Sequence, residues 1–296
     1  MNNRDNRLAD HHSYNEDNST REAITIINCF LNAPLMLISI LGNALVLAAI
    51  LRTPAIRSTH MIMLCSLAFS DLLVGVIVQP IYIAQQLTKD RYLNYVWKVL
   101  GPFLCGVSLL TITAIAVDRS LALHYHMRYA TLVTESRVKY VLIIIWLISL
   151  LVPFFYFWKT SVQIILIGVS IVTCLIISTF SYIRIFRIVR RHHLHINAQQ
   201  QAVQSSDAKN NLNMTRLRRS AMNTFVLYIV LIICYFPLCI VSFVGKDWKT
   251  GWKFSSTLMF SNSCINPFLY CWRLRELRAA IVKTAKQVLR QETEEN

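Results

Sequence analysis

Seven long apolar blocks dominate this chain of 296 residues, which is 55% hydrophobic and only 15% charged. A helix needs about 17 to 25 apolar residues to cross a hydrocarbon layer of roughly 30 Å. Each block is long enough, and together they cover residues 24–51, 61–87, 96–117, 141–157, 160–183, 221–245 and 254–272. We therefore expect an all-α membrane protein in which residues 24–272 form a seven-transmembrane helix bundle.

The connection between the fourth and fifth blocks consists only of Trp158 and Lys159. One long buried span is an alternative there, but the joint run of 141–183 exceeds a single bilayer crossing. Two helices joined by a tight turn fit better.

The distribution of Lys and Arg predicts the orientation, because cytoplasmic loops retain positive charge. Loops 52–60, 118–140, 184–220 and 273–296 together hold 20 of the 30 Lys and Arg residues. We therefore expect a multi-pass plasma-membrane protein with an extracellular N-terminal tail at 1–23, a third intracellular loop at 184–220 and a cytoplasmic C-terminus. The formal charge of +15 then reflects a basic face against anionic lipids or an acidic partner, and no nucleic-acid partner is expected.

The segment after the last block, 273–296, is expected to form an amphipathic helix on the inner membrane surface, followed by a short cytoplasmic tail. Such a helix carries an apolar stripe opposite a basic face and binds membrane lipids. The stripe comprises Leu274, Leu277, Ile281, Ala285 and Val288.

Covalent features are few. Asn18 begins an Asn-Ser-Thr triplet in the outer tail and is a glycosylation candidate. The eight cysteines lie within or at the margins of the apolar blocks, so they are interpreted as small core hydrophobes without a disulfide or a metal-binding spacing.

Polar side chains recur near the middle of several spans. The positions are Asn43, Asp71, Ser108, Asn262, Ser263 and Asn266. Polar residues inside a span are costly and normally face the protein interior. Helix-to-helix hydrogen bonding is the simpler interpretation for an isolated residue such as Ser261, but the repeated pattern predicts one shared polar cavity.

Asp71 is the only acidic residue deep within any block. An ionised carboxylate there needs a cation, a set of hydrogen bonds or a proton. The neighbouring oxygens are hard ligands suited to a small cation with water, and Ser108, Asn262, Ser263 and Asn266 supply them. Pro267 frees a backbone carbonyl one turn earlier, so we expect the seventh helix to bend at this site.

Short motifs occur in order, one to a span: "GN", "LAFSD", "DRS", Trp146, "CYFP" and "NPFLY". They resemble the markers of rhodopsin-like G-protein-coupled receptors over about residues 24–290. The resemblance implies a receptor, not an enzyme, that binds an extracellular small molecule, lipid or peptide and activates a heterotrimeric G protein. It also implies that Asp71, Ser108, Asn262, Ser263 and Asn266 hold a sodium ion with water.

The same resemblance implies an activation switch at the inner ends of the helices. Its residues are Asp118, Arg119, Tyr182, Tyr235, Pro237, Asn266, Pro267 and Tyr270. Many relatives restrain the sixth helix with an acidic residue that pairs with the arginine, but Leu217 occupies that position here. The resemblance therefore implies appreciable activity without ligand.

The outer half departs from the common family pattern. Asn94 stands where relatives have a disulfide cysteine, and Cys174 replaces a proline of the fifth helix. These absences resemble the melanocortin, cannabinoid and adenosine branch. The acidic residues that melanocortin receptors use are nevertheless replaced by Ile81, Asn94 and Lys98, so a melanocortin ligand does not follow.

Ligand chemistry is constrained by two further positions. Gly101 stands where amine receptors have an aspartate, and Phe260 where opsins have a lysine; no retinal is expected. The expected pocket lining is Lys98, Gly101, Cys105, Leu238, Cys239, Ser242, Ser256 and Phe260. Lysines around its mouth favour an uncharged or anionic ligand, although interfacial snorkelling is the commoner role of such lysines.

An ion-coupled transporter or pump is the alternative function for seven spans with a deep aspartate. Such proteins usually show internal repeats or several intramembrane charges. The sequence has no repeat and one deep acid, so the receptor is favoured.

Overall fold

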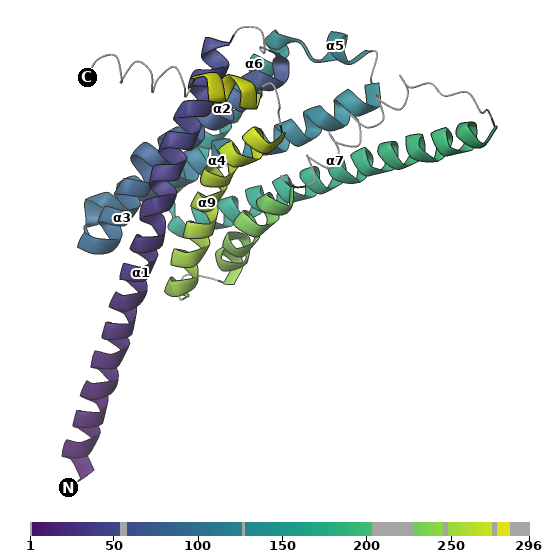
Figure 1. The fold of residues 1–296 in the computed structure, drawn as a ribbon. Coiled ribbons are helices and arrows are strands. Elements are labelled where there is room, and N and C mark those ends of the chain that lie inside the picture. The colour runs from purple at the N-terminus through teal and green to yellow at the C-terminus, as the bar shows by residue number, and fades with distance from the viewer. Residues whose placement is uncertain are drawn as a thin grey trace, which may run out of the picture.

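The computed structural model describes residues 2–53, 58–125, 128–202, 226, 228–244, 248–273 and 277–284. Its long helices are α1 (Asn2–Arg52), α2 (Thr59–Leu73), α3 (Gln79–Thr88), α4 (Arg91–Tyr125), α6 (Glu135–Trp158), α7 (Thr160–Ala202) and α9 (Lys249–Arg273), with a further helix at Tyr228–Val244. Figure 1 shows these helices gathered into one bundle, from which the N-terminal part of α1 and the C-terminal part of α7 project.

Five stretches of the described chain are long and apolar enough to cross a membrane. They are Ser19–Arg52, Thr59–Thr88, Arg91–Tyr125, Glu135–Trp158 and Thr160–Arg191, and Tyr228–Val244 is a shorter apolar helix. Each falls on one of the first six apolar blocks. The seventh block lies within α9, which has the length of a span and carries the polar residues Asn262, Ser263 and Asn266.

Local sequence sets several of the helix boundaries. Ser58 and Thr134 are N-caps whose side chains accept hydrogen bonds from backbone N–H groups of α2 and α6. Lys89 has a left-handed φ of 55° and ends α3. Asp90 then accepts a hydrogen bond from Leu93 N at the start of α4. These caps position the short turns of the bundle.

The turn between α6 and α7 is as tight as the sequence predicts. Lys159 has extended backbone angles, φ −156° and ψ 114°, and its N–H donates to the Phe155 carbonyl. The expectation of two helices rather than one long span is therefore confirmed.

A π-helical segment, η2 (Val74–Val78), joins α2 to α3 within the second span. Pro80 lies two residues beyond its end. A proline has no N–H to donate, and its ring clashes with the carbonyl four residues earlier. The wider turn lets Gln79 N–H donate to the Val74 carbonyl, which accommodates the proline inside a continuous helix. This segment was not predicted from the apolar pattern, and Pro80 is the one signal for it in the sequence.

A short helix at 277–284 packs on the bundle. Leu277, Ala280, Ile281 and Thr284 are buried, and the intervening side chains are exposed. This spacing is that of an amphipathic helix, as expected for Leu277 and Ile281. Leu274, Ala285 and Val288, the other expected members of the stripe, lie outside the described residues.

Candidate functional site

The Asp71 carboxylate lies at the centre of a buried polar cluster between three spans. Ser108 of α4 and Ser263 of α9 each donate a hydrogen bond of 2.7 Å to Asp71 Oδ1. Asn266 of α9 donates to the other oxygen, Oδ2, also at 2.7 Å. Because Asp71 is fully buried, these three donors supply the hydrogen bonds that an intramembrane carboxylate requires.

A second set of hydrogen bonds fixes α1 and α9 beside Asp71. Ser39 of α1 donates to the Asp71 carbonyl at 3.0 Å. Asn43 donates to the Ser39 carbonyl at 2.9 Å and to the Ser263 carbonyl at 3.0 Å. Ser39 and Asn43 of the first span therefore hold the backbone of Asp71 and Ser263, respectively, in place.

The side chains around Asp71 fit a small hard cation. Asn266 Oδ1 and Asn43 Oδ1 are buried oxygens with no hydrogen-bond donor in the described part of the chain. Together with the Asp71 carboxylate and the serine hydroxyls they form an all-oxygen donor set of the kind that such cations prefer. Asn262 precedes Ser263 in α9 and is buried, and its Nδ2 has no acceptor among the described residues.

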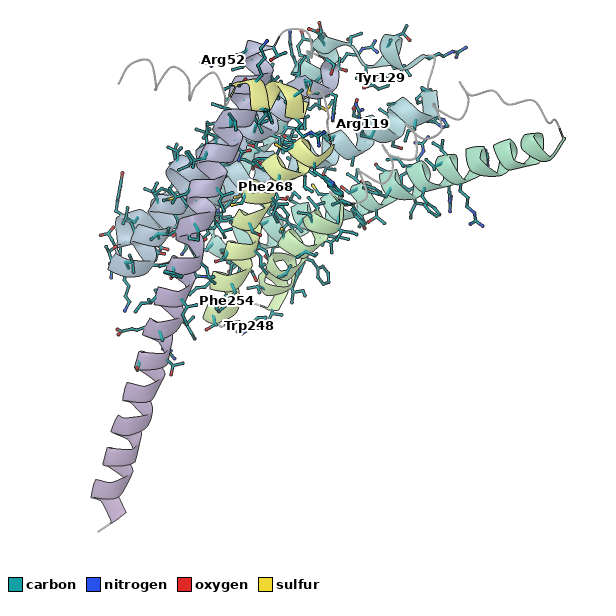
Figure 2. The ribbon with its side chains drawn as sticks, in the orientation of Figure 1. Arg52, Arg119, Tyr129, Trp248, Phe254 and Phe268 are labelled. Atoms are coloured by element: carbon teal, nitrogen blue, oxygen red, sulfur yellow. The ribbon has the colours of Figure 1, made fainter. Side chains whose placement is uncertain are left out.

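A cluster of Asp118, Arg119 and Tyr129 lies toward the end of the bundle where Arg52 is found (Figure 2). Arg119 Nε donates to Asp118 Oδ2 at 3.0 Å, and Nη2 forms an ion pair with the same oxygen. The Tyr129 hydroxyl of α5 (Tyr129–Leu132) donates to Asp118 Oδ1 at 2.6 Å. Figure 2 shows Arg119 and Tyr129 near this end, far from Trp248 and Phe254. Asp118 thus binds one partner through each of its two oxygens.

Burial, followed by the hydrogen bond to Asp118, raises the pKa of the Tyr129 hydroxyl above its usual range. The phenol therefore remains a neutral donor at physiological pH. The side chain of Ser120, next to Arg119, is also buried.

The helix Tyr228–Val244 contacts its neighbours at two levels. The Tyr235 hydroxyl donates to the Cys105 carbonyl of α4 at 3.3 Å, and Pro237 lies half-buried two residues later. Nearer the Arg119 end, the Tyr228 ring stacks on Tyr182 of α7, with ring centroids 4.8 Å apart. Tyr182 and Tyr270, the two expected switch tyrosines, are both buried, and Pro267 lies inside α9.

Two smaller expectations concern side chains away from these clusters. Ser261 of α9 contacts Cys234 of the Tyr228–Val244 helix, the helix-joining role considered for it. Trp146 donates to Ser66 at 3.1 Å and so joins α6 to α2. Asn18 and Leu217 lie where side chains are not described.

A cavity of about 590 Å³ opens at the opposite end of the bundle from Arg119. Its walls come from α3, α4, α7, the Tyr228–Val244 helix and α9. The polar part of the wall contains Lys98, Lys253, Gln85, Asn94 and Gln163, and the larger apolar part contains Trp97, Trp252, Ile164, Ile167, Leu238 and Met259. This size and lining are typical of a pocket for an organic ligand.

Three of the eight expected pocket residues, Lys98, Leu238 and Ser256, line the cavity. Gly101 does not, because the Trp97 ring covers it: a Cβ on Gly101 would lie 2.8 Å from that ring. Phe260 is fully buried beneath Tyr82 and Trp97, with ring centroids 5.3 and 6.1 Å away.

The other three expected pocket residues are directed into helix contacts. Cys105 and Cys239 are buried in the apolar core. Ser242 donates to the Leu238 carbonyl of its own helix. Five of the eight expected positions are therefore not among the residues that line this cavity. Sequence register alone does not reveal which side chains cover them.

The sequence matches the family described as 7 transmembrane receptor (rhodopsin family) over residues 42–163 and 153–270. The chain belongs to this family. The resemblance carried by the short motifs is thereby confirmed, and so is the seven-transmembrane bundle. The receptor is a multi-pass membrane protein and not an enzyme; it signals through G proteins in response to an extracellular ligand.

Similar receptors have different ligands. The chain is 27% identical over 282 residues to the histamine H2 receptor of Cavia porcellus, covering 83% of this chain and 76% of that one. It is 28% identical to melanocortin receptor 4 of Danio rerio, over 85% of this chain and 80% of that receptor. It is 25% identical to adenosine receptor A3 of Ovis aries, over 82% of this chain and 84% of that receptor. The family model establishes the family of the receptor, and these relatives leave its ligand class open.

A polar network that was not predicted from the sequence joins α1, α3 and α9 beside the cavity. Asn28 donates to Thr257 at 2.7 Å, Asn32 donates to Thr257 at 2.8 Å, and Tyr82 donates to Asn28 Oδ1 at 3.0 Å. The signal was the four-residue spacing of Asn28 and Asn32, which puts both amides on one face of the first span.

Proposed function

We propose that the receptor converts binding of an extracellular, non-aminergic ligand into heterotrimeric G-protein activation at the plasma membrane, through an outward swing of the Tyr228–Val244 helix. In this proposal the Arg119 end faces the cytoplasm and the Lys98 end faces outward. The main support is the arrangement of two sites at opposite ends of one bundle. Arg119 and Tyr129 are hydrogen-bonded to Asp118 at one end, and the ligand-sized cavity lies at the other. Release of Arg119 from Asp118 exposes a fork of cationic donors to the G protein.

The Tyr228–Val244 helix is suited to carry the movement. Its Tyr235 contacts α4, its Leu238 lines the cavity, and its Tyr228 packs on α7 nearer the Arg119 end. Pro237 removes one backbone hydrogen bond between these levels, which provides a place to bend. A ligand that binds the swung state more tightly shifts the population toward that state.

The non-aminergic assignment follows from charge. No Asp or Glu belongs to the described cavity wall, whereas Lys98 and Lys253 do. An ammonium ligand would be repelled by both lysines and would lack the carboxylate that Gly101 replaces. The histamine relatives make this a point to test directly: a panel of biogenic amines should give no response in cells that carry G-protein biosensors, and a potent amine response would refute it.

Sodium binding is proposed for the Asp71 cluster. Asp71, Ser108, Ser263 and Asn266 would hold the ion, with Asn262 bordering the site. The positive charge supplied there would balance the buried Asp71 carboxylate and favour the resting arrangement. The chain contributes the negative charge and the orientation of the oxygen donors.

We also propose appreciable signalling without ligand. Leu217 cannot supply an acidic restraint for Arg119. Arg119 is therefore held by Asp118 without the second acidic residue that many relatives have. An ion pair that is partly exposed contributes about 1 kcal/mol or less. This difference corresponds to an increase of up to roughly fivefold in the active population.

The experiment that tests the function is a ligand-library screen in cells that carry sensors for each G-protein class. Wild-type receptor and Arg119→Ala should be compared at equal surface expression. A ligand that activates the wild type and not the variant supports coupling through Arg119. Equal responses from both would contradict it.

A further inference from the structure

Two half-buried lysines form the charged part of the cavity wall. Lys98 comes from α4, and its ammonium lies over the Tyr156 ring, 5.5 Å from the centroid. Lys253 comes from α9, on another side of the cavity. The two cations are therefore fixed by different helices and face one space.

The environment of Lys253 leaves its charge without an anionic partner in the described part of the chain. Its ammonium donates to the Thr25 hydroxyl of α1, a neutral acceptor. An ammonium has three N–H donors, so this bond uses one of them. A half-buried cation beside neutral groups is an unfavourable arrangement that an anion can relieve.

Neutral amides extend the polar region. Gln163 donates to the Lys98 carbonyl at 2.9 Å and so holds the start of α7 against α4. Gln85 and Asn94 also line the cavity, and their side-chain N–H groups are donors of the type that carboxylate and phosphate oxygens accept.

The remainder of the cavity is apolar. Trp97, Trp252, Ile167, Leu238 and Met259 line it, and a hydrocarbon body placed against them would be removed from water. A volume of about 590 Å³ accommodates such a body together with a compact head group.

From this juxtaposition of two cations with an apolar wall, we propose that the receptor's ligand is an anionic amphiphile, with a carboxylate or phosphate head bound by Lys98 and Lys253 and a hydrocarbon body against the tryptophan and aliphatic wall. This inference rests on the proposed function, since it names the ligand class of the same cavity.

The test uses four ten-carbon probes that differ only in the head group: decanoate, decyl phosphate, decan-1-ol and decylamine. Full-length receptor is reconstituted in nanodiscs of neutral phosphatidylcholine, and its Tm is measured with each probe. The two anions should raise the Tm by about 3 °C or more at saturation, and the alcohol and amine should raise it less. Equal shifts with all four heads would overturn the proposal.

Variants then assign the effect to the lysines. Lys253→Gln and Lys98→Gln should each weaken the apparent affinity for decyl phosphate by about tenfold or more, because each removes one charge-assisted hydrogen bond. Lys253→Arg should retain binding, and the exposed Lys159→Gln is the matched control outside the cavity. If Lys253→Gln folds with an unchanged ligand-free Tm and retains full affinity, the head-group assignment is wrong.

A charge-reversed variant keeps the proposal testable even if a neutral substitution unfolds the protein. Lys98→Glu should lose the response to decyl phosphate and gain one to decylamine. A response to decyl phosphate as strong as that of the wild type would contradict the proposal.

The source of the amphiphile is distinguished by lipid composition. If phosphatidylglycerol in the nanodisc suppresses the shift produced by decyl phosphate, a bilayer lipid occupies the cavity; if it does not, a free amphiphile is the ligand. Both outcomes retain the anionic head. No G protein is present in these measurements, so loss of the Tm shift and loss of G-protein signalling are separate failures.

Discussion

The side-chain hydroxyls of Tyr228 and Thr179 are hydrogen-bonded across the interface between α7 and the Tyr228–Val244 helix, 2.5 Å apart. The Tyr228 ring also stacks on Tyr182, at an interplanar angle of 27°. Both contacts lie on the part of the helix that is proposed to swing outward. We therefore expect them to restrain the resting arrangement in addition to the Arg119–Asp118 pair.

Removal of this restraint should raise basal signalling. Tyr228→Phe keeps the ring and loses a hydrogen bond whose net contribution is about 1 kcal/mol, so the active population should rise up to roughly fivefold. Tyr228→Ala also loses the stacking and should signal more. The measurement is basal G-protein sensor output against surface expression, with the exposed Tyr140→Phe as control. Unchanged output in both Tyr228 variants would show that the contact is not a brake.

Tyr129→Phe should also raise basal signalling, because Asp118 loses its second partner. Folding raises the pKa of Tyr129 above its ordinary value of about 10. The stabilisation that the neutral Tyr129 hydroxyl gives through its hydrogen bond to Asp118 is therefore complete below about pH 10. It is lost only as the pH rises through the raised pKa. The difference between wild type and variant should stay constant from about pH 6 to 9. Tyr125→Phe, in the exposed part of the same region, is the control, and a difference that disappears within this window would contradict the assignment.

Sodium should lower signalling through the Asp71 cluster. A cation with higher affinity for one conformation stabilises it by that difference alone. Basal output should fall as sodium replaces choline at constant ionic strength, and Asp71→Asn should abolish the dependence. The exposed Asp90→Asn is a matched control that should keep it. The sodium site is refuted if wild type and Asp71→Asn respond equally.

Gly42→Ala should destabilise the receptor by about 1–3 kcal/mol. A Cβ there would lie 2.9 Å from Pro267 Cγ and 3.0 Å from Pro267 Cβ, so α1 and α9 would have to separate. Gly106→Ala is the control, because its nearest neighbour is Ser149 Oγ at 3.5 Å, an ordinary contact. Thermal unfolding in detergent should show a lower Tm for Gly42→Ala only. Equal Tm values would mean that the helices adjust without cost.

The spans were predictable because lipid imposes a composition on any helix that crosses it. The partners of Asp71 were largely predictable for the same reason: polar groups at mid-depth must satisfy one another, and Ser108, Ser263 and Asn266 do so. In contrast, a tyrosine in an apolar block is unremarkable in sequence, so the Tyr228 contact was not foreseen.

The cavity lining was harder to predict than the spans. Whether Gly101 faces a ligand depends on the conformation of Trp97, which covers it, and sequence spacing does not determine a rotamer. The sequence does not distinguish Lys253 from the other lysines near the ends of the spans. Its place in the cavity wall follows from the contact of α9 with α1, a tertiary feature.

The most direct measurement of receptor function is basal G-protein activation as a function of surface expression, for wild type, Arg119→Ala and Leu217→Glu. The wild-type signal should rise with expression for at least one G-protein class, Arg119→Ala should remove that rise, and Leu217→Glu should lower it by supplying the missing restraint. A wild-type signal indistinguishable from that of empty cells across all sensors, at verified surface expression, would contradict ligand-independent coupling through Arg119.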